Sequence, residues 1–294
     1  MSNHGVFVCY TIIMSNILAI IPTFNSVDLV IERIVELKNS TFTKIVICDD
    51  KSDDGTVSTL KEKYGDLIEV ISGDNNLGPG GNRNRILTHE LIETADYLFF
   101  LDADCQIIYK DDITDIITKS FERSNDGVIG FSLVDRESNP MRWNYGELMH
   151  PVHEAPDQKL EAMLATGVIT NEQFIEWAPS LAASYRMTME NGIKEVGWVA
   201  EGCFAVRADL FKRIGGFADQ MRYHEAHDFN ARVQELDYKT LFNPIVVAQH
   251  LEFDSRMERR DSDNRSGKLY YYQKHWGMSE EVYSKLFDES STSI

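Results

Sequence analysis

The feature that most constrains this chain is an apolar run that ends in two closely spaced carboxylates. Residues 97–101 read Tyr-Leu-Phe-Phe-Leu, and Asp102, Ala103 and Asp104 follow at once. An uncharged run of this kind, rich in aromatic residues, is typical of a strand buried on both faces of a parallel sheet. Ligands of open α/β folds bind at the carboxyl ends of such strands. A divalent cation with oxygen ligands would explain the two carboxylates; a solvated loop in which one Asp caps the next helix is the alternative.

Three further strands are predicted before this run, and each ends in a polar loop. Apolar or β-rich segments at 17–21, 44–48 and 69–72 are separated by helical patterns, of which 28–38 is the clearest. Pro22 is expected to end the first strand, because proline cannot continue a central strand. This alternation of strand and helix predicts an α/β fold with a doubly wound, mostly parallel central sheet. The functional site is expected along one edge of that sheet.

A glycine-rich loop precedes the fourth strand. It occupies residues 76–81 (Asn-Leu-Gly-Pro-Gly-Gly) and opens a helix that is predicted to continue to about Thr94. Backbone N–H groups at a glycine-rich helix start can face a phosphate. The sequence has neither Gly-x-Gly-x-x-Gly after its first strand nor Gly-Lys-Ser/Thr, so neither a dinucleotide-binding fingerprint nor a P-loop is indicated.

The strongly negative net charge of the chain excludes some classes of ligand. The 294 residues carry a formal net charge of −18, which argues against nucleic acid as a partner, because binding to phosphate backbones needs a basic surface. A small phosphate ligand stays open, since one cation and a few arginines can reverse the field inside a cleft. The four cysteines are scattered without a Cys-x-x-Cys pair, which predicts buried free thiols and a reducing cytoplasm.

The N-terminal segment is apolar without being a membrane signal. Residues 6–21 are interrupted by polar side chains, and no basic flank or small-residue cleavage site precedes them. Residues 1–16 are therefore interpreted as an N-terminal extension, and no integral membrane segment is predicted. The expected location is the cytoplasm, including peripheral contact with the inner face of the membrane.

In the second half of the chain, further carboxylate and histidine side chains lie within or at the ends of predicted strands and helices. Residues 196–206 are apolar around a central Glu-Gly. Residues 223–232 crowd two histidines and two carboxylates at the start of a helix. Residues 240–249 read as a strand that delivers His250 at its end, despite an internal proline.

Four motifs resemble those of the family-2 nucleotide-sugar glycosyltransferases, which are inverting enzymes with the GT-A fold. In chain order they are Ile-Pro-Thr-Phe-Asn at 21–25, Cys-Asp-Asp-Lys-Ser-Asp-Asp-Gly-Thr at 48–56, Asn-Leu-Gly at 76–78 with Asn-Arg-Asn at 82–84, and Leu-Asp-Ala-Asp at 101–104. The resemblance covers residues 17 to 276. Each motif alone is weak, but four in the family's order favour metal binding over the loop interpretation of Asp104.

The resemblance implies a nucleotide-sugar site at these motifs. Asp49 or Asp50 would accept a hydrogen bond from a uracil-type N–H, and Arg83 would lie near the base and ribose. The residues implied for this site are Pro22, Thr23, Asn25, Asp49, Asp50, Asn76, Gly78, Arg83, Asp102 and Ala103.

The resemblance also implies a metal site. Asp104 and His250 would ligate Mn²⁺ or Mg²⁺, and Asp102 would contact the ribose or the same metal. A nucleoside diphosphate leaves only if its growing negative charge is neutralised, and a divalent cation can do this.

A general base is the next requirement, because the attacking hydroxyl must lose a proton. The family places an acidic pair before x-x-x-Arg at the start of a helix, and residues 227–232 here read His-Asp-Phe-Asn-Ala-Arg. Asp228 would therefore be the base, with His227 in place of the family's Glu. The alternative is that Asp228 only caps the helix. If the base lies elsewhere, Glu225 is the first candidate and Glu201 the second.

The remaining implied features lie on the acceptor side and in the tail. The acceptor-side residues are Trp198, Glu201, Gly202, Glu225 and His227, although a tryptophan such as Trp198 is more often part of a core. The arginines at 256, 259, 260 and 265 would form a lid over the diphosphate or a solvated face. Residues 270–276 are expected to form a packing helix.

Taken together, the sequence predicts a metal-dependent inverting glycosyltransferase. It would transfer a sugar from a nucleoside-diphosphate donor, with uridine favoured, to a hydroxyl of a glycan or glycolipid. Residues 17–110 would form the nucleotide-sugar-binding half of one GT-A domain, and residues 111–294 its mixed acceptor-binding and catalytic half. A nucleotidyltransferase is an alternative, but it would need a basic glycine-rich loop directly after the first strand. A catalytically decayed binding module is the other alternative, against which the presence of Asp104, Asp228 and His250 argues.

Overall fold

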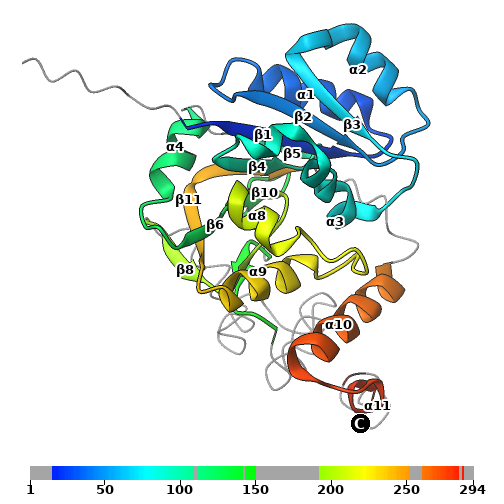
Figure 1. Ribbon diagram of the computed structural model, residues 1–294, viewed down its shortest axis with the longest axis vertical. Helices are drawn as coiled ribbons and strands as arrows, with labels where there is room; N and C mark the ends of the chain where they lie inside the picture. Colours follow the sequence, from blue (N-terminus) through cyan, green and yellow to red (C-terminus); the bar gives the residue numbers. More distant parts are fainter. Residues whose placement is uncertain are drawn as a thin grey trace, which may run out of the picture.

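A nine-stranded sheet is the centre of the molecule. The computed structural model describes residues 15–108, 112–141, 143–149, 192–251, 260–284 and 287. The strands of the sheet are β1 (Ile17–Thr23), β2 (Lys44–Asp49), β3 (Ile68–Ser72), β4 (Tyr97–Leu101), β5 (Cys105–Ile107), β6 (Asp126–Val134), β8 (Lys194–Val196), β10 (Cys203–Arg207) and β11 (Lys239–His250). Their order is β3-β2-β1-β4-β10-β6-β11-β5, with β8 paired to β11 (Figure 1). A separate two-stranded sheet joins β7 (Tyr145–Gly146) to β9 (Trp198–Val199).

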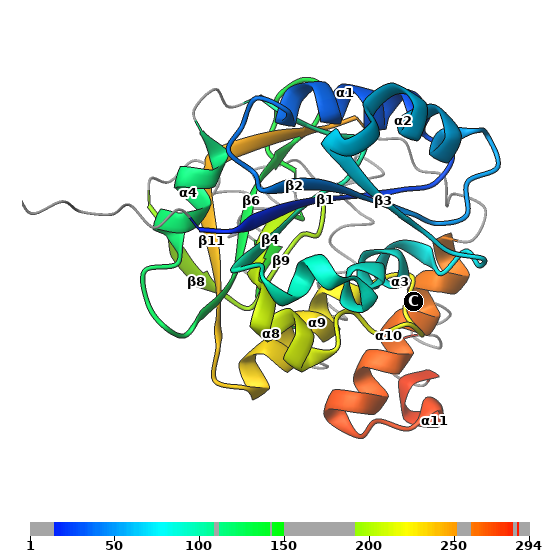
Figure 2. The same ribbon diagram turned by 45° about the horizontal axis from the view of Figure 1, so that its top comes forward.

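Helices cover both faces of the large sheet. They are α1 (Val27–Leu37), α2 (Thr56–Tyr64), α3 (Gly78–Arg83), α4 (Ile113–Ser120), α8 (Ala208–Ile214), α9 (Glu225–Glu235), α10 (Arg260–Trp276) and α11 (Glu280–Tyr283). On one face, α1, α2 and α4 pack through side chains such as Ile34, Leu60 and Ile117. The other face is covered by α8 and α9 (Figure 2). These two helices pack through side chains such as Phe211 and Val233.

The first four strands are parallel, as the alternating pattern predicts. β1 pairs with β2 and β4, and β2 pairs with β3, all in parallel. Residues 98–101 of β4 are fully buried, which explains why the run carries no polar side chain. The predicted α/β fold with a mostly parallel sheet is thus confirmed. Strand β10 is antiparallel to both β4 and β6, so it joins the two halves of the chain in one sheet.

The predicted end of the first strand is wrong by two residues. β1 continues through Pro22 to Thr23, pairing with β2 as far as Asp49, whereas its pairing with β4 ends at Ile20. Pro22 therefore lies where β1 has a neighbouring strand on one side only, a position in which proline is tolerated.

The helix predicted after the glycine-rich loop is also broken. α3 ends at Arg83 and is followed by two short 3₁₀ helices, Asn84–Thr88 and Glu90–Glu93. The backbone of His89 is extended between them (φ −102°, ψ 138°), which interrupts any continuous helix.

The C-terminal elements agree with the sequence pattern. β11 ends at His250, as predicted. Its internal proline lies within an irregularity of the pairing with β6, where the register shifts between Asn243 and Val247. Tyr271 and Tyr272 of α10 are buried against Tyr283, so the expected packing helix is confirmed.

The predictions about buried cysteines and about membrane segments can be compared with the structure only for the described residues. Cys48, Cys105 and Cys203 are buried free thiols, whereas Cys9 lies outside the described residues. Most of the predicted extension, residues 1–14, also lies outside them. Within the residues that are described, no helix combines the length and apolarity needed to cross a bilayer.

Candidate active site

A cavity of about 990 Å³ opens at the carboxyl ends of β1, β2 and β4. The predicted donor-site and metal residues that line it are Pro22, Thr23, Asn25, Asp50, Asn76, Gly78, Arg83, Asp102, Ala103 and Asp104. Asp49 and His250 are not part of its lining. The position agrees with the rule that ligands of open α/β sheets bind beyond the carboxyl ends of the strands.

Hydrogen bonds from the Asn82 side chain hold α3 against the ends of β1 and β2. Its side-chain nitrogen donates to the carbonyl oxygen of Cys48 (2.7 Å) and, at 3.3 Å, to that of Thr23. The Nε of Arg85 donates to its side-chain oxygen (3.1 Å). Because buried backbone carbonyls at strand ends need a donor, this amide fixes the floor of the cavity.

Hydrogen bonds between Asn25 and Asp53 connect the loops that follow β1 and β2. The Nδ2 of Asn25 donates to the Asp53 carboxylate (2.9 Å), and the backbone N–H of Asp53 donates to Asn25 Oδ1 (2.9 Å). Asn25 has a φ of 49°, in the left-handed region that asparagine tolerates better than most residues. The Asn of the first motif thus shapes the cavity wall through a specific turn.

Asp50 occupies the N–H groups of the glycine-rich loop. Its carboxylate accepts from the backbone N–H groups of Leu77 (2.8 Å) and Gly78 (2.9 Å) and from Arg85 (3.0 Å). These N–H groups therefore hold the loop to β2 and do not point to an external phosphate. Asp49 is buried and accepts from the N–H of Ser52 (3.1 Å), while its Oδ1 is buried without a partner among the described residues.

Arg83 and Asp102 form a buried ion pair at the cavity wall. Arg83 Nη2 lies 2.6 Å from Asp102 Oδ1, and it also donates to the backbone oxygen of Glu201 at 3.4 Å. Burial opposes the positive charge, but the carboxylates of Asp102, Glu201 and Glu225 outweigh it and raise the pKa of Arg83. The N–H of Asp102 donates to the Gly202 carbonyl (3.0 Å), so the predicted acceptor-side turn lies next to the two-carboxylate motif.

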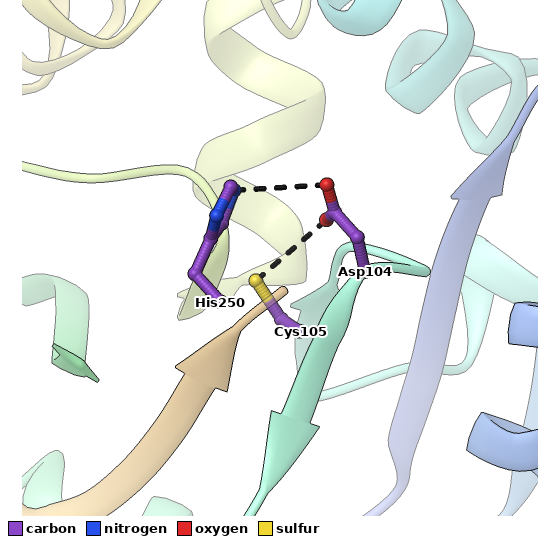
Figure 3. Close-up of side chains that lie close together, drawn as sticks. All are labelled: Asp104, Cys105 and His250. Atoms are coloured by element: carbon purple, nitrogen blue, oxygen red, sulfur yellow. Dashed lines mark hydrogen bonds and ion pairs between the residues drawn. The ribbon is translucent and has the colours of Figure 1, made fainter. Parts of the chain in front are cut away.

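Asp104 and His250 meet through strand pairing. β5 and β11 are antiparallel with His250 opposite Cys105, and the Leu251 N–H donates to the Asp104 carbonyl (2.8 Å). His250 Nε2 lies 3.7 Å from Asp104 Oδ2 (Figure 3). Cys105 Sγ lies 3.9 Å from Asp104 Oδ1, and the ligand atoms of the three residues are all within 4.8 Å of one another.

The donor set at this point fits a hard or intermediate divalent cation. Burial and the carboxylates of Asp104 and Asp102 raise the pKa of the Cys105 thiol well above its usual range, and hard divalent cations prefer oxygen and nitrogen ligands to sulfur. Asp102 is committed to Arg83 through one oxygen. A carboxylate oxygen and an imidazole nitrogen remain as the principal ligands, and a cation held by these two needs further ligands from a bound molecule or water.

The environment of Asp228 argues against its predicted role as general base. The side chain is fully buried; its Oδ2 accepts from Arg232 (2.8 Å), and its Oδ1 accepts from Lys274 (2.7 Å) and lies 2.9 Å from His275 Nε2. Burial alone would raise its pKa, but His275, Arg232 and Lys274 together lower it to about 2. A carboxylate held this way is weakly basic, which makes it a poor acceptor for the proton of an attacking hydroxyl.

The capping interpretation of Asp228 is wrong as well. The N-cap of α9 is His224, with a φ of 62°, and Asp228 is the fourth helical residue. The crowded segment allows a helix start at either position, and the sequence pattern alone does not distinguish them.

The acceptor-side residues lie around the start of α9. Glu201 Oε1 accepts from the N–H of Ala226 (3.0 Å), and Glu225 is buried with 3% of its surface exposed. The ring of His227 packs on Trp198 with centroids 4.4 Å apart, and burial lowers the pKa of His227 well below its usual range. Trp198 is itself buried, which fits the core interpretation of that residue.

Besides residues 26–29 at the start of α1, the cavity lining includes two distant side chains that the sequence analysis did not place at the site, Arg222 and Asp263. Neither belongs to a motif, and each reaches the cavity from a segment far along the chain. Of the arginines predicted as a lid, residues 256 and 259 lie outside the described part of the chain, as does the side chain at 260. Arg265 is described and contacts α11, donating to Ser284 Oγ (3.1 Å).

A family comparison agrees with this geometry. The sequence model described as "Glycosyl transferase family 2" matches residues 18–214. Among characterised proteins, poly(ribitol-phosphate) beta-glucosyltransferase of Bacillus spizizenii (strain ATCC 23059 / NRRL B-14472 / W23) is 35% identical over 92 residues. The match covers 29% of this chain and 14% of that relative's length.

Solved structures share the fold at low sequence identity. A crystal structure of GalNAc-T7 with UDP, GalNAc and Mn²⁺ superposes with a TM-score of 0.56 at 12% identity, covering 82% of this chain and 45% of the other. A crystal structure of S. aureus TarS 1–349 gives a TM-score of 0.51 at 14% identity, covering 92% and 77%. The sheet and its flanking helices therefore have the arrangement of known glycosyltransferases.

Proposed function

The chain belongs to glycosyltransferase family 2, and from that premise we propose that it is a metal-dependent, inverting enzyme. It transfers a sugar from a uridine-diphosphate donor to a hydroxyl group of a glycan or glycolipid. The observation that carries this proposal is the convergence of Asp104 and His250 beside the cavity, with Nε2 and Oδ2 3.7 Å apart.

The metal is the first part of the proposal. Asp104 and His250 would hold a divalent cation, whose bound charge would neutralise the departing diphosphate. Both side chains are partly exposed, at 20% and 27%, so a donor could complete the coordination. An imidazole ligand suits Mn²⁺ better than Mg²⁺, which strongly prefers oxygen. The Mn²⁺ in the GalNAc-T7 crystal structure supports the same choice by analogy.

The donor is the second part. Thr23, Asn76 and Asp102 line the cavity with polar groups suited to a nucleoside. Arg83 holds the Asp102 carboxylate through a 2.6 Å contact, so that this carboxylate can accept from ribose hydroxyls without being free to rotate. The UDP in the GalNAc-T7 crystal structure supports uridine as the base to test first.

Glu201 is the carboxylate that we propose as general base. It lies beside Asp102, because the adjoining Gly202 carbonyl accepts from the Asp102 N–H (3.0 Å). Glu201 is partly exposed, whereas Glu225 is nearly enclosed, and an acceptor hydroxyl must reach the base directly or through one water. The side chain would take the hydroxyl proton as the oxygen attacks the anomeric carbon.

The third part of the proposal is the acceptor, which is a molecule that offers a hydroxyl group. The B. spizizenii relative is named for action on poly(ribitol-phosphate), so a polyol-phosphate polymer joins glycans and glycolipids as a source of the attacking hydroxyl. All three offer the same nucleophile, a neutral hydroxyl that needs a base.

Calorimetry of UDP binding tests the metal and donor together. The wild-type chain should bind UDP in Mn²⁺, more weakly in Mg²⁺, and least in EDTA. Asp104→Asn should lose the Mn²⁺-dependent part of the affinity, about 10²-fold or more, since even supporting residues of metal sites give 10- to 100-fold losses. Asp115→Asn is the matched control, because Asp115 forms an exposed pair with Lys119 on α4. Unchanged UDP binding by folded Asp104→Asn would remove the metal from the proposal.

Substitution of two carboxylates, Glu201 and Glu225, separates the candidates for the base. Glu201→Gln should bind UDP normally but lose about 10²–10⁴-fold in transfer rate, the usual contribution of a positioned base. Glu225→Gln serves as the comparison. If Glu225→Gln loses transfer and Glu201→Gln does not, the base is Glu225.

A further inference from the structure

Among the described residues, strand β5 has a neighbouring strand on one side only. It pairs with β11 and is the last strand in the order of the sheet. Its outer side presents the backbone N–H groups of Cys105 and Ile107, and each of them has an acceptor outside the sheet. The Cys105 N–H donates to the Asp102 carbonyl (2.9 Å), and the Ile107 N–H donates to Oε1 of the Glu36 side chain (2.6 Å). A carboxylate of α1 thus takes the place of a neighbouring strand at this edge.

Glu36 is held in place by a buried arginine of the same helix. The Arg33 side chain is 2% exposed, and its Nε lies 3.0 Å from Glu36 Oε2. Burial of the Glu36 carboxyl outweighs the attraction of Arg33 and raises the pKa of Glu36 to about 7. Because this carboxylate is largely removed from water, solvent competes little for its hydrogen bond with the Ile107 N–H.

The contact with Ile107 lies three residues from a candidate cation ligand. Asp104 comes directly before β5, and His250 is the last residue of β11 (Figure 3). Their side chains meet only if β5 keeps its register, because a slip of one residue turns every side chain to the opposite face. β5 is only three residues long, so few hydrogen bonds join it to β11. A bond on its outer side therefore contributes more to its position than it would in a long strand.

Helix α1 is a rigid support for this bond. Val30, Ile34 and Leu37 of α1 are buried in the same hydrophobic cluster as Cys105 of β5. Because this cluster is closely packed, α1 cannot move relative to β5 without opening the core. A side chain on such an element can hold a strand within the small positional tolerance that a metal site requires.

We propose that Glu36 is a positioning residue of the Asp104–His250 cation site, and that it acts through its hydrogen bond with the Ile107 N–H. Glu36 is not part of the cavity lining, so it influences a bound cation only through the strand. This assignment rests on the proposed function, because it takes Asp104 and His250 to be the metal ligands. Groups that orient metal ligands without touching the metal commonly change its affinity by 10- to 100-fold.

Calorimetry of Mn²⁺ binding in the presence of UDP tests the assignment at about pH 8, above the pKa of Glu36. Loss of Glu36 alone would leave Arg33 buried without its closest anionic partner, which is strongly destabilising, so both test variants also carry Arg33→Met. With Glu36→Leu, which has no acceptor for the Ile107 N–H, the Mn²⁺ affinity should fall by about 10- to 100-fold. With Glu36→Gln, whose amide oxygen can still accept that N–H, the affinity should stay close to that of the wild type.

Glu32→Gln is the matched control for charge. Glu32 is on the same helix and also pairs with Arg33, but its side chain is 59% exposed. The substitution removes the same negative charge without touching β5, so the Mn²⁺ affinity should stay within about twofold of wild type.

A purely structural role of Glu36 gives a different result. It would lower the free energy of unfolding in urea for the Glu36→Leu variant but leave its Mn²⁺ affinity equal to that of the Glu36→Gln variant, which would overturn the assignment. Equal losses of Mn²⁺ affinity in the two variants would also overturn it, since only one of them lacks the hydrogen bond. UDP binding in EDTA should be the same in both, and a loss confined to Glu36→Leu would mean that the whole cavity is disturbed, against the assignment.

The wild type separates this assignment from the proposed function. If the wild type binds no Mn²⁺ in the presence of UDP, the proposed metal site is wrong and the role of Glu36 is wrong with it. If the wild type binds Mn²⁺ and the Glu36→Leu variant binds it equally well, only the role of Glu36 is overturned.

Discussion

An Asp–His pair occurs in two regions of this molecule with opposite surroundings. Asp104 and His250 lie at the edge of the sheet beside the cavity, 3.7 Å apart and partly exposed. Asp228 and His275 lie between α9 and α10, 2.9 Å apart, with Asp228 fully buried. The first pair leaves its ligand atoms accessible, whereas the second is closed.

The difference lies in the other charges around each carboxylate. Asp228 also contacts Arg232 and Lys274, so three basic groups share one negative charge. Removing the carboxylate would leave Arg232 and Lys274 without the anionic partner that they share at a fully buried position, which is costly. The same two residue types thus make an anchor between helices at one place and, in the function that we propose, a ligand set for a cation at the other. A carboxylate's role follows from the number of cations around it rather than from the motif in which it occurs.

The largest expected effect is on stability, in Asp228→Asn. The isosteric amide keeps the volume but cannot balance Arg232, Lys274 and His275, so the free energy of unfolding should fall by about 3–5 kcal/mol. Urea denaturation measures it, with Asp115→Asn as an exposed control that should change it by about 1 kcal/mol or less. A stable Asp228→Asn variant that has lost all transfer would restore Asp228 as the base.

The second effect is on binding, in His250→Gln. Loss of the imidazole ligand should reduce Mn²⁺-dependent UDP affinity by about 10- to 100-fold. The free energy of unfolding should change by no more than about 0.5 kcal/mol, because the side chain is partly exposed at the edge of the sheet. A variant with reduced stability and unchanged affinity would show that the two pairs do not differ as described.

The third effect depends on pH. The pKa of Asp228 is lowered from 3.8 to about 2 in the folded chain, so its charged form is stabilised by folding. Its contribution is complete above pH 4 and is lost as the pH falls toward 2, an effect of about 2 kcal/mol. The stability difference between wild type and Asp228→Asn should therefore shrink by about that amount between pH 5 and pH 2. A constant difference across this range would mean that the Asp228 charge is not what stabilises the cluster.

The smallest effect is expected from Cys105→Ala. The thiol lies 3.9 Å from Asp104 but is buried, and Mn²⁺ prefers oxygen and nitrogen ligands to sulfur, so the thiol should not ligate the cation. The affinity for Mn²⁺, measured by calorimetry, should stay within about twofold of wild type, since the two ligands that matter are unchanged. A tenfold loss would make Cys105 a third ligand and alter the metal preference of the site.

Much of the fold and of the cavity could be predicted because the relevant signals are local. The uninterrupted apolar run of residues 97–101 marks a buried strand, and the polar residues that follow a strand in a parallel sheet must lie at its carboxyl edge. Asp50, Asp102 and Asp104 are each placed by that rule alone. The positions of these residues can be predicted whenever the strand and its direction in the sheet are predicted correctly.

The role of Asp228 could not be predicted, because its partners are distant in sequence. Lys274 and His275 come from α10, 46 and 47 residues further on, and no local pattern links them to α9. Arg222 was missed for a related reason, since its contact with Asn76 spans 146 residues. A lone arginine in a loop carries no signal until the loop's position is known.

The pairing of β5 with β11 also determines when the candidate cation site can form during folding. Asp104 is synthesised long before His250, and the two side chains come together through the pairing of β5 with β11. Contacts between such distant segments carry a large loop-closure entropy and tend to form late. A cation held by Asp104 and His250 would therefore have no complete protein ligand set until β5 and β11 have paired, so it would bind the folded chain and would not nucleate folding.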